Sequence, residues 1–306
     1  MTQKALDKHW LIVSDLDGTL LDHFTYSHAP VDALLRQLEA SSVPVILNSS
    51  KTRDEMLEIR RELDNRHPFI VENGSAIFIP SGYFPDMPAG AREQDDFWVL
   101  EPGLPRERLL DHLQSDAEAH GAPYLGFSAA PVEEIVSATG LSPEQARAAK
   151  ARSYSEPLLW RGSEEEKRDF RARASDAGLA TLEGGRFLHL LGDTDKGRAT
   201  RQLLGCYRRA APASYTLVAA GDSPNDLDML EVADIALIIR GPHREPPQLE
   251  ETDSRRVLTS RLEGPEGWRE CIEQLIQPHS GNGDNNEATA TQRENTRTPR
   301  PHRRQQ

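Results

Sequence analysis

The chain has 306 residues, a formal net charge of -13 and a sequence pI of about 5.3. This acidic balance disfavours nucleic acids and anionic membranes as partners, and no apolar run approaches the ~18 residues that a membrane helix needs. The length predicts one large domain or two ordinary ones. Two cysteines occur, Cys206 and Cys271, without a CxxC motif or a signal-peptide core at the N-terminus, so we expect a cytoplasmic protein.

The first predicted strand, residues 11–14, runs directly into Asp15-Leu-Asp17-Gly-Thr19. Side chains alternate between the two faces of a strand, so the carboxylates of Asp15 and Asp17 are expected to point the same way. Two carboxylates this close repel each other unless a cation lies between them. Mg²⁺ prefers such oxygen ligands. The motif predicts a magnesium site, although an ordinary acidic loop remains the alternative on these residues alone.

Strands and helices alternate through the next segment. The apolar spacing predicts a helix at 31–38, a strand at 43–47, a helix after the Thr52–Glu55 capping box, a strand at 69–71, and a further strand at 76–79 after the hairpin signal Asn73-Gly74. Strands joined in this way by helices favour a parallel sheet with crossover helices. The predicted class is therefore α/β, with a Rossmannoid core.

The middle of the chain predicts a separate α/β module. We expect strands at 97–100, 124–128, 156–160, 179–182 and 186–190, and helices at 106–120, 143–152 and 164–177. The first module then resumes with a helix at 196–209, a strand at 215–220, a helix from Pro224 to Val232, a last strand at 235–239 and a final helix at 268–276. The predicted domains are a core of residues 1–84 and 193–277, an inserted cap of residues 85–192 and a polar, disordered tail of residues 278–306.

Four polar segments follow strands or begin helices, and such ends converge at the ligand crevice of a parallel sheet. Asp15 is the predicted nucleophile, because a carboxylate can attack phosphorus and form an aspartyl phosphate. Asp17 is the predicted general acid for the leaving oxygen and then the base for water. Ser49, with the next backbone N–H, is expected to hold a phosphoryl oxygen. Lys196 is expected to neutralise the phosphate.

Each of these residues also has a structural interpretation. Ser49 can be an ordinary helix cap, and Lys196 an exposed surface lysine. Asp222, directly after the strand at 215–220, is expected to join Asp15 and Asp17 as a magnesium ligand. Asp226 fits a capping pattern with Ser223, and it is also predicted, with Asn225, to orient water around the metal.

The order of these segments resembles the haloacid dehalogenase superfamily: DxDGT, then Ser or Thr, then Lys, then GDxxxD. The position of the inserted module, between the second and third segments, resembles the type-two cap of the Cof-like phosphatases. This resemblance implies a Mg²⁺-dependent phosphatase with a haloacid dehalogenase-like core.

A narrower resemblance is to the mannosyl-3-phosphoglycerate phosphatase family. It is carried by the motifs Asn48-Ser-Ser-Lys-Thr-Arg53, Pro68-Phe-Ile-Val-Glu-Asn-Gly74, Gly221-Asp-Ser-Pro-Asn-Asp226, Glu263-Gly-Pro-Glu-Gly-Trp268 and, in the cap, Arg152-Ser-Tyr-Ser-Glu-Pro157. Most Cof-like relatives have Thr-Gly-Arg where this chain has Ser49-Ser50-Lys51. The match extends from about Leu11 to Ile276.

This family resemblance implies hydrolysis of 2-O-mannosyl-3-phosphoglycerate to mannosylglycerate, an osmolyte, and phosphate. The substrate residues that it implies are Ser50, Lys51, Asn73, Gly74, Arg152 and Glu156, with Arg53, Glu72 and Arg244 as further candidates. Two alternatives stay open. The substrate can be glucosyl-3-phosphoglycerate or another sugar phosphate, or the chain can be a non-catalytic binding protein on the same fold.

Overall fold

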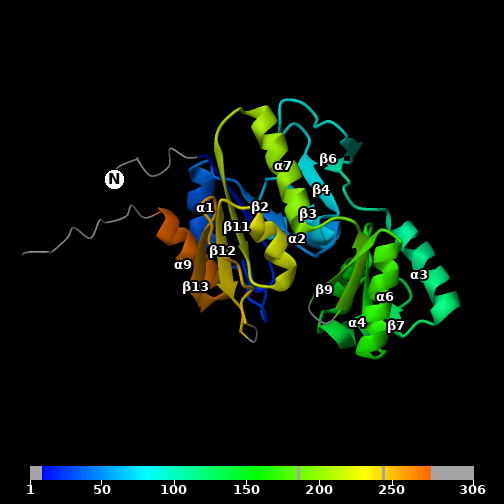
Figure 1. The fold of residues 1–306 in the computed structure, drawn as a ribbon. Helices are drawn as coiled ribbons and strands as arrows, with labels where there is room; N and C mark the ends of the chain where they lie inside the picture. Colours follow the sequence, from blue (N-terminus) through cyan, green and yellow to red (C-terminus); the bar gives the residue numbers. More distant parts are fainter. Residues whose placement is uncertain (1–8, 185–186, 243–244, 277–306) are drawn as a thin grey trace, which may run out of the picture.

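The computed structural model describes residues 9–184, 187–242 and 245–276, in which two β-sheets organise an α/β fold (Figure 1). The larger sheet has nine strands in the order β13-β12-β11-β1-β2-β3-β4-β6-β5. Its strands are β1 (His9–Ser14), β2 (Val45–Asn48), β3 (Phe69–Val71), β4 (Ala76–Pro80), β5 (Arg92–Gln94), β6 (Phe97–Leu100), β11 (Tyr215–Gly221), β12 (Ile235–Arg240) and β13 (Arg256–Glu263). The pairs from β13 to β3 are parallel, as predicted, and β4, β6 and β5 extend the sheet in antiparallel fashion.

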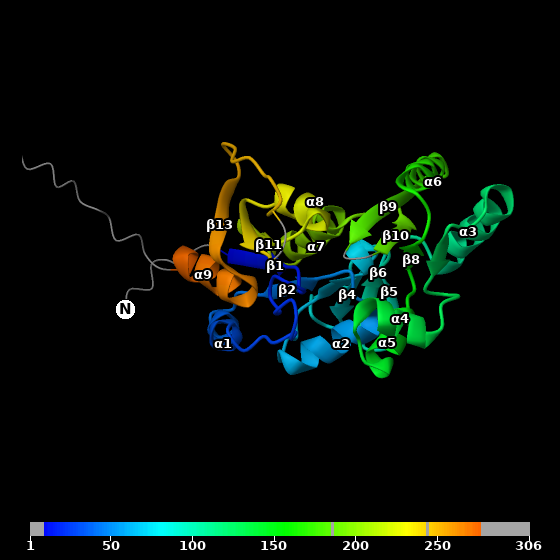
Figure 2. The same cartoon turned by 90° about the horizontal axis from the view of Figure 1, so that it is seen from below.

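Helices cover both faces of this sheet, because its central strands are apolar on both sides. In β1, Ile12 packs into one hydrophobic cluster while Leu11 and Val13 pack into the other. The first cluster includes side chains of α1 (Asp32–Ala40), α2 (Arg53–Glu62) and α9 (Gly264–Ile276), and the second includes side chains of α7 (Lys196–Ala210) and α8 (Leu227–Glu231). Figure 2 shows these two sets of helices on opposite sides of the sheet.

The smaller sheet is antiparallel, with the order β7-β8-β10-β9, and forms the cap (Figure 2). Its strands are β7 (Tyr124–Gly126), β8 (Ser155–Trp160), β9 (Leu179–Gly184) and β10 (Phe187–Gly192). Leu188 faces α3 (Arg106–His120) and α6 (Glu164–Asp176), while its neighbour Phe187 faces α4 (Val132–Thr139) and α5 (Pro143–Lys150). Among the described residues, no helix is both long enough and apolar enough to cross a membrane.

The structure corrects three expectations. Residues 92–100 form β5 and β6 of the large sheet, so the core continues past the predicted boundary at residue 85. The ring of Phe97 lies edge-on to Phe69 and Phe78, at 5.6 and 5.9 Å between centroids, and this packing explains why the strand joins the core. The strand β12 is followed by another strand, β13, and α4 was not predicted. The hairpin predicted at Asn73-Gly74 is confirmed: these residues lie in a short 3₁₀ turn, η2 (Glu72–Gly74), between antiparallel β3 and β4. The predicted tail lies outside the described residues.

Both connections between core and cap pass the turn η2. On the outgoing connection, the backbone N–H of Gly103 donates to the carbonyl of Ser75 at 2.9 Å. On the returning connection, the Thr194 hydroxyl donates to the carbonyl of Gly74 at 3.1 Å. Gly74 has a φ of +92°, and a Cβ at this position would lie 2.1 Å from the carbonyl oxygen of Asp195. Only glycine allows this approach, because it combines a left-handed backbone with an absent side chain.

Gly74→Ala is expected to lower the free energy of unfolding by about 2 kcal/mol or more. The cost of a left-handed backbone at alanine and the cost of the clash with Asp195 both contribute to this loss. Gly82→Ala is the matched control: its φ is +79°, but nothing lies within 4 Å of its added Cβ. Chemical denaturation of both variants measures the difference. Equal losses in the two variants would show that φ alone, without the contact at Asp195, makes Gly74 necessary.

Candidate active site

The first feature of the site is a buried lysine between two aspartates. Asp15 directly follows β1, and Lys196 is the first residue of α7. The Lys196 ammonium donates to Asp15 Oδ1 at 2.6 Å and to Asp226 Oδ1 at 2.7 Å. Lys196 is only 1% exposed. Burial lowers its pKa, but the two carboxylates outweigh burial and hold the pKa above its usual value, so the side chain is a cation.

The second feature is an acidic cluster. Asp15, Asp222 and Asp226 place carboxylate oxygens within 4.8 Å of one another. Asp222 Oδ1 accepts a hydrogen bond from the Thr19 hydroxyl at 3.1 Å. Asp226 Oδ2 accepts from the backbone N–H groups of Asp222 and Ser223, at 3.1 and 3.0 Å, which closes the turn after β11. These contacts hold three carboxylates together against their mutual repulsion.

The charges of this cluster do not balance. Three carboxylates face one ammonium, so full ionisation leaves an excess of two negative charges. Burial, followed by the charge of Asp226, raises the pKa of Asp15 to about 7 despite Lys196. Burial, followed by the charges of Asp15 and Asp226, raises the pKa of Asp222 to about 8. A divalent cation would relieve this excess, and three carboxylate oxygens are ligands that suit Mg²⁺. The residues therefore fit a magnesium ion.

The Asp17 side chain does not belong to this cluster. Its Oδ2 accepts a hydrogen bond from the Lys51 ammonium at 2.8 Å. Its Oδ1 is buried and has no hydrogen bond within the described part of the chain. The alternation that predicted Asp15 and Asp17 on one face applies only within a strand, and β1 ends at Ser14. The structure therefore separates the two carboxylates and pairs Asp17 with a cation from the loop after β2.

A cavity of about 580 Å³ lies over these groups, between the core and the cap. From the core it is lined by Asp15, Asp17, Ser49, Ser50, Lys51, Asp222 and Asn225, and from the cap by Phe127, Leu141, Phe187 and others. The core side carries most of the charged groups, whereas the cap side mixes apolar side chains with the polar residues Thr139, Gln145, Arg152 and His189. Ser49 is 1% exposed, and its hydroxyl accepts a hydrogen bond from the Lys51 N–H at 3.3 Å.

Asn73 and Gly74 lie behind the cavity wall, in the turn η2. The Asn73 side chain accepts a hydrogen bond from the amide of Asn225 at 3.4 Å, and Asn225 itself lines the cavity. Arg53 forms an ion pair with Asp95 at 2.6 Å. Arg244 lies outside the described residues. The structure thus gives Asn73 and Gly74 supporting positions, rather than the direct substrate contacts that the sequence suggested.

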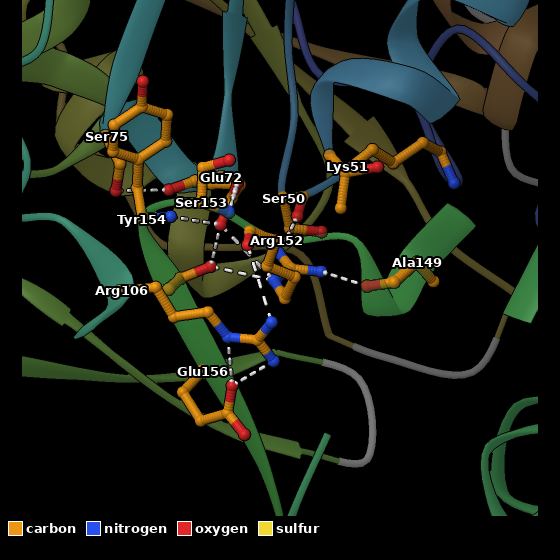
Figure 3. Close-up of polar contacts among 12 residues, drawn as sticks. Ser50, Lys51, Glu72, Ser75, Arg106, Ala149, Arg152, Ser153, Tyr154 and Glu156 are labelled. Atoms are coloured by element: carbon orange, nitrogen blue, oxygen red, sulfur yellow. Dashed lines mark hydrogen bonds and ion pairs between the residues drawn. The ribbon is translucent and has the colours of Figure 1, made fainter. Parts of the chain in front are cut away.

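Arg152 and Glu156, the two cap residues predicted to bind the substrate, instead bond to other residues of the protein (Figure 3). Glu156 is fully buried; its carboxylate forms an ion pair with Arg106 at 2.5 Å and accepts the Ser128 N–H at 2.7 Å. The Arg152 guanidinium donates to the carbonyl of Ser50, to the Ser155 hydroxyl and to the carbonyl of Ala149. The expectation that Glu156 meets the substrate is therefore corrected, because both of its oxygens have partners inside the cap. Arg152 borders the cavity, but its donors point into the protein.

Sequence reasoning missed four supporting residues. Tyr26 lies with its ring centroid 5.1 Å from the Lys51 ammonium, in a polar loop that has no periodic signal. Asn48 donates from its amide to the Lys196 carbonyl at 3.1 Å and thereby ties β2 to α7. The position of Asn48, a polar residue at the end of an apolar strand, was the only sign in the sequence of this role. Phe127 packs edge-on against Phe187 at 5.0 Å, and nothing in the sequence indicated that these rings line the cavity.

Comparison with known proteins agrees with this architecture. Residues 12–84 match the haloacid dehalogenase-like hydrolase family. This segment contains Asp15, Asp17, Ser49 and Lys51, so it includes two of the strand ends that build the site.

Several solved structures share this fold over most of the chain. A Thermoplasma acidophilum protein superposes with a TM-score of 0.59 at 17% identity, covering 88% of this chain and 100% of that one. A haloacid dehalogenase-like hydrolase from B. subtilis has a TM-score of 0.52 at 20% identity, and the match covers 74% of this chain and 88% of that one. Sucrose-phosphatase from Synechocystis sp. PCC6803, solved with sucrose and phosphate, has a TM-score of 0.55 at 14% identity, covering 88% and 98%. At these identities the likeness concerns the fold.

The raised pKa values of Asp15 and Asp222 predict how pH and Mg²⁺ act on stability. Between pH 4 and 8 the folded protein binds more protons at these groups than the unfolded chain, so in EDTA its stability should fall as the pH rises. Mg²⁺ would replace those protons. The increase in melting temperature caused by Mg²⁺ should therefore be larger at pH 8 than at pH 6.

Thermal unfolding with EDTA or Mg²⁺ at both pH values measures this effect. Asp222→Asn should reduce the increase caused by Mg²⁺. Asp228→Asn, at an exposed position of the neighbouring helix α8, should retain it. A Mg²⁺ effect of the same size in Asp222→Asn and in the wild type would exclude Asp222 as a ligand.

Proposed function

We propose that the protein is a cytoplasmic, Mg²⁺-dependent phosphatase that cleaves phosphate monoesters through an aspartyl phosphate on Asp15. The observation that carries this proposal is the Asp15 carboxylate itself. Lys196 binds its Oδ1, while no described residue forms a hydrogen bond to its Oδ2, and the residue borders the cavity. One oxygen is thus fixed and the other is available to attack phosphorus.

The neighbouring groups supply the charge that this reaction needs. An ammonium has three donors, and two of those on Lys196 bind Asp15 and Asp226, which leaves one for a phosphoryl oxygen. Asp15 and Asp222, with Asp226 beside them, are the residues that would hold Mg²⁺. The chemistry supplied by the bound ion is neutralisation of charge on the phosphoryl oxygens.

We assign the proton transfers of this reaction to Asp17. In its protonated form it would donate to the oxygen of the leaving alcohol as the bond between that oxygen and phosphorus breaks. The resulting carboxylate would then take a proton from the water that attacks the phosphorus of the aspartyl phosphate. Inorganic phosphate leaves, and both aspartates return to their starting state. Lys51 holds one Asp17 oxygen in place at 2.8 Å, so the buried Oδ1 is the candidate proton donor.

For the substrate, we propose 2-O-mannosyl-3-phosphoglycerate, with mannosylglycerate as the product. A cavity of about 580 Å³ can hold a sugar attached to a phosphorylated acid. Lys51 and the polar core side suit the anionic end, and the cap side leaves room for the sugar. A structural neighbour, sucrose-phosphatase, was solved with a sugar and phosphate bound. Glucosyl-3-phosphoglycerate differs in the orientation of one hydroxyl group and is the alternative to be tested beside it.

Asp15→Asn should lower phosphate release on the order of a thousandfold or more, because the amide has nearly the same shape but is a poor nucleophile. The measurement is release of inorganic phosphate from p-nitrophenyl phosphate with saturating Mg²⁺. Asp54→Asn, at an exposed position in the first turn of α2, is the control and should retain activity. Undiminished turnover by Asp15→Asn would eliminate the aspartyl-phosphate mechanism.

A parallel screen of the wild type decides the substrate. Mannosyl-3-phosphoglycerate should be hydrolysed with a higher kcat/KM than glucosyl-3-phosphoglycerate and than p-nitrophenyl phosphate. A preference for the glucosyl compound would change the substrate and leave the chemistry intact. Activity on p-nitrophenyl phosphate alone would reject both glycosides.

A further inference from the structure

The loop after β2, residues 49–51, is held by all three of its carbonyl groups. The Ser49 carbonyl accepts the backbone N–H of Asn73 at 3.0 Å, and the Lys51 carbonyl accepts that of Glu72 at 3.0 Å. The Ser50 carbonyl, between them, accepts a hydrogen bond from the Arg152 guanidinium at 2.5 Å. The outer two donors belong to the core turn η2, whereas the middle donor comes from the cap.

These contacts also fix the amide groups of the loop. In a trans peptide the N–H of each residue points opposite to the preceding carbonyl, because the peptide unit is planar. Holding the Ser50 carbonyl therefore sets the direction of the Lys51 N–H. That N–H donates to the Ser49 hydroxyl at 3.3 Å, and Ser49 and Lys51 both line the cavity. The shape of this part of the cavity thus depends on a cap residue.

Arg152 is itself held firmly. It is 9% exposed, and its Nε donates to the Ser155 hydroxyl at 2.9 Å and lies 3.5 Å from the Glu72 carboxylate. Glu72 is 1% exposed and accepts three further hydrogen bonds from the same cap segment: from Ser153 N–H at 2.9 Å, Tyr154 N–H at 3.1 Å and the Ser155 hydroxyl at 2.6 Å. Figure 3 shows these contacts converging on Glu72.

Tyr154 anchors the same segment in the core. Its side chain is 6% exposed and packs in the hydrophobic cluster that contains the core residues Phe69 and Phe78. Its hydroxyl donates to Glu101, directly after β6, at 2.5 Å. We name residues 152–155 the clasp, because they form an attachment between cap and core in addition to the two chain connections.

We infer that Arg152 is a positioning residue that gives the phosphate-binding loop, residues 49–51, its active shape only while the clasp is docked on Glu72. This inference rests on the proposed function, since it assigns residues 49–51 to phosphate binding. It differs from the substrate contact that the sequence suggested for Arg152. A contact to the sugar or to the glycerate carboxylate would matter only for substrates that carry these groups, whereas a contact to the loop matters for every phosphate ester.

The test compares Arg152→Ala with Arg147→Ala, an exposed arginine on the adjacent helix α5. Loss of a buried, charge-assisted hydrogen bond should lower kcat/KM at least about tenfold. The loss in kcat/KM should be similar for p-nitrophenyl phosphate and mannosyl-3-phosphoglycerate. Inorganic phosphate should also inhibit Arg152→Ala more weakly than it inhibits the wild type. Arg152→Lys, which retains a donor, should recover part of the loss. Arg147→Ala should behave like the wild type.

Hydrogen–deuterium exchange tests the loop without relying on activity. Amide exchange in residues 49–52 should become faster in Arg152→Ala and in Glu72→Gln, but not in Arg147→Ala. Circular dichroism verifies that each variant is folded. Arg152→Met, which keeps the length of the side chain but has no donor, replaces Arg152→Ala if Arg152→Ala does not fold. A loss confined to mannosyl-3-phosphoglycerate, or unchanged exchange in residues 49–52, overturns the inference. A wild type that is inactive on every phosphate ester rejects the proposed function, while the exchange measurement still decides whether Arg152 holds the loop.

Discussion

The ammonium of Lys196, buried between Asp15 and Asp226, is the interaction on which the site depends. Removing one partner from such a buried group leaves an uncompensated charge, which typically costs about 3–5 kcal/mol. The lysine is supplied by the start of α7, and the two aspartates follow β1 and β11. Its correct placement therefore requires three elements that are distant in sequence to meet at one edge of the sheet.

The parallel sheet brings these elements together. In β1, Ile12 pairs with Val45 of β2 and with Val218 of β11, so the ends of three neighbouring strands lie side by side. Asp15, Ser49 and Asp222 follow these ends. The acidic cluster and the loop after β2 then share one cavity with the cap above them. The proposed phosphate chemistry therefore lies on the core, and the cap covers the rest of the cavity.

The sequence predicted the core well because its signals are local. The apolar run before Asp15 predicts a strand, and the capping box at Thr52 predicts a helix start, without reference to any distant residue. Both capping hydrogen bonds between Thr52 and Glu55 form as expected. The partners of Asp17 and Glu156 could not be predicted in this way. Asp17 pairs with Lys51, and Glu156 pairs with Arg106, 50 residues away. Such pairings depend on tertiary packing, and an isolated charge in the sequence does not identify its partner.

The turn η2 has a mechanical consequence. Both chain connections bond to residues of this turn region, at Gly74 and Ser75, and the clasp bonds to Glu72, so three attachments of the cap converge on residues 72–75. Further contacts between cap and core lie outside it, among them those of Arg152 with Ser50 and of Thr52 with Ala148. The cap segments near residues 72–75 lie close to the acidic cluster, whereas α3 and α6 lie at the outer end of the cap, as Figure 2 shows. A rotation of the cap about residues 72–75 would therefore displace α3 and α6 more than the segments of the cap that border the cavity over Asp15.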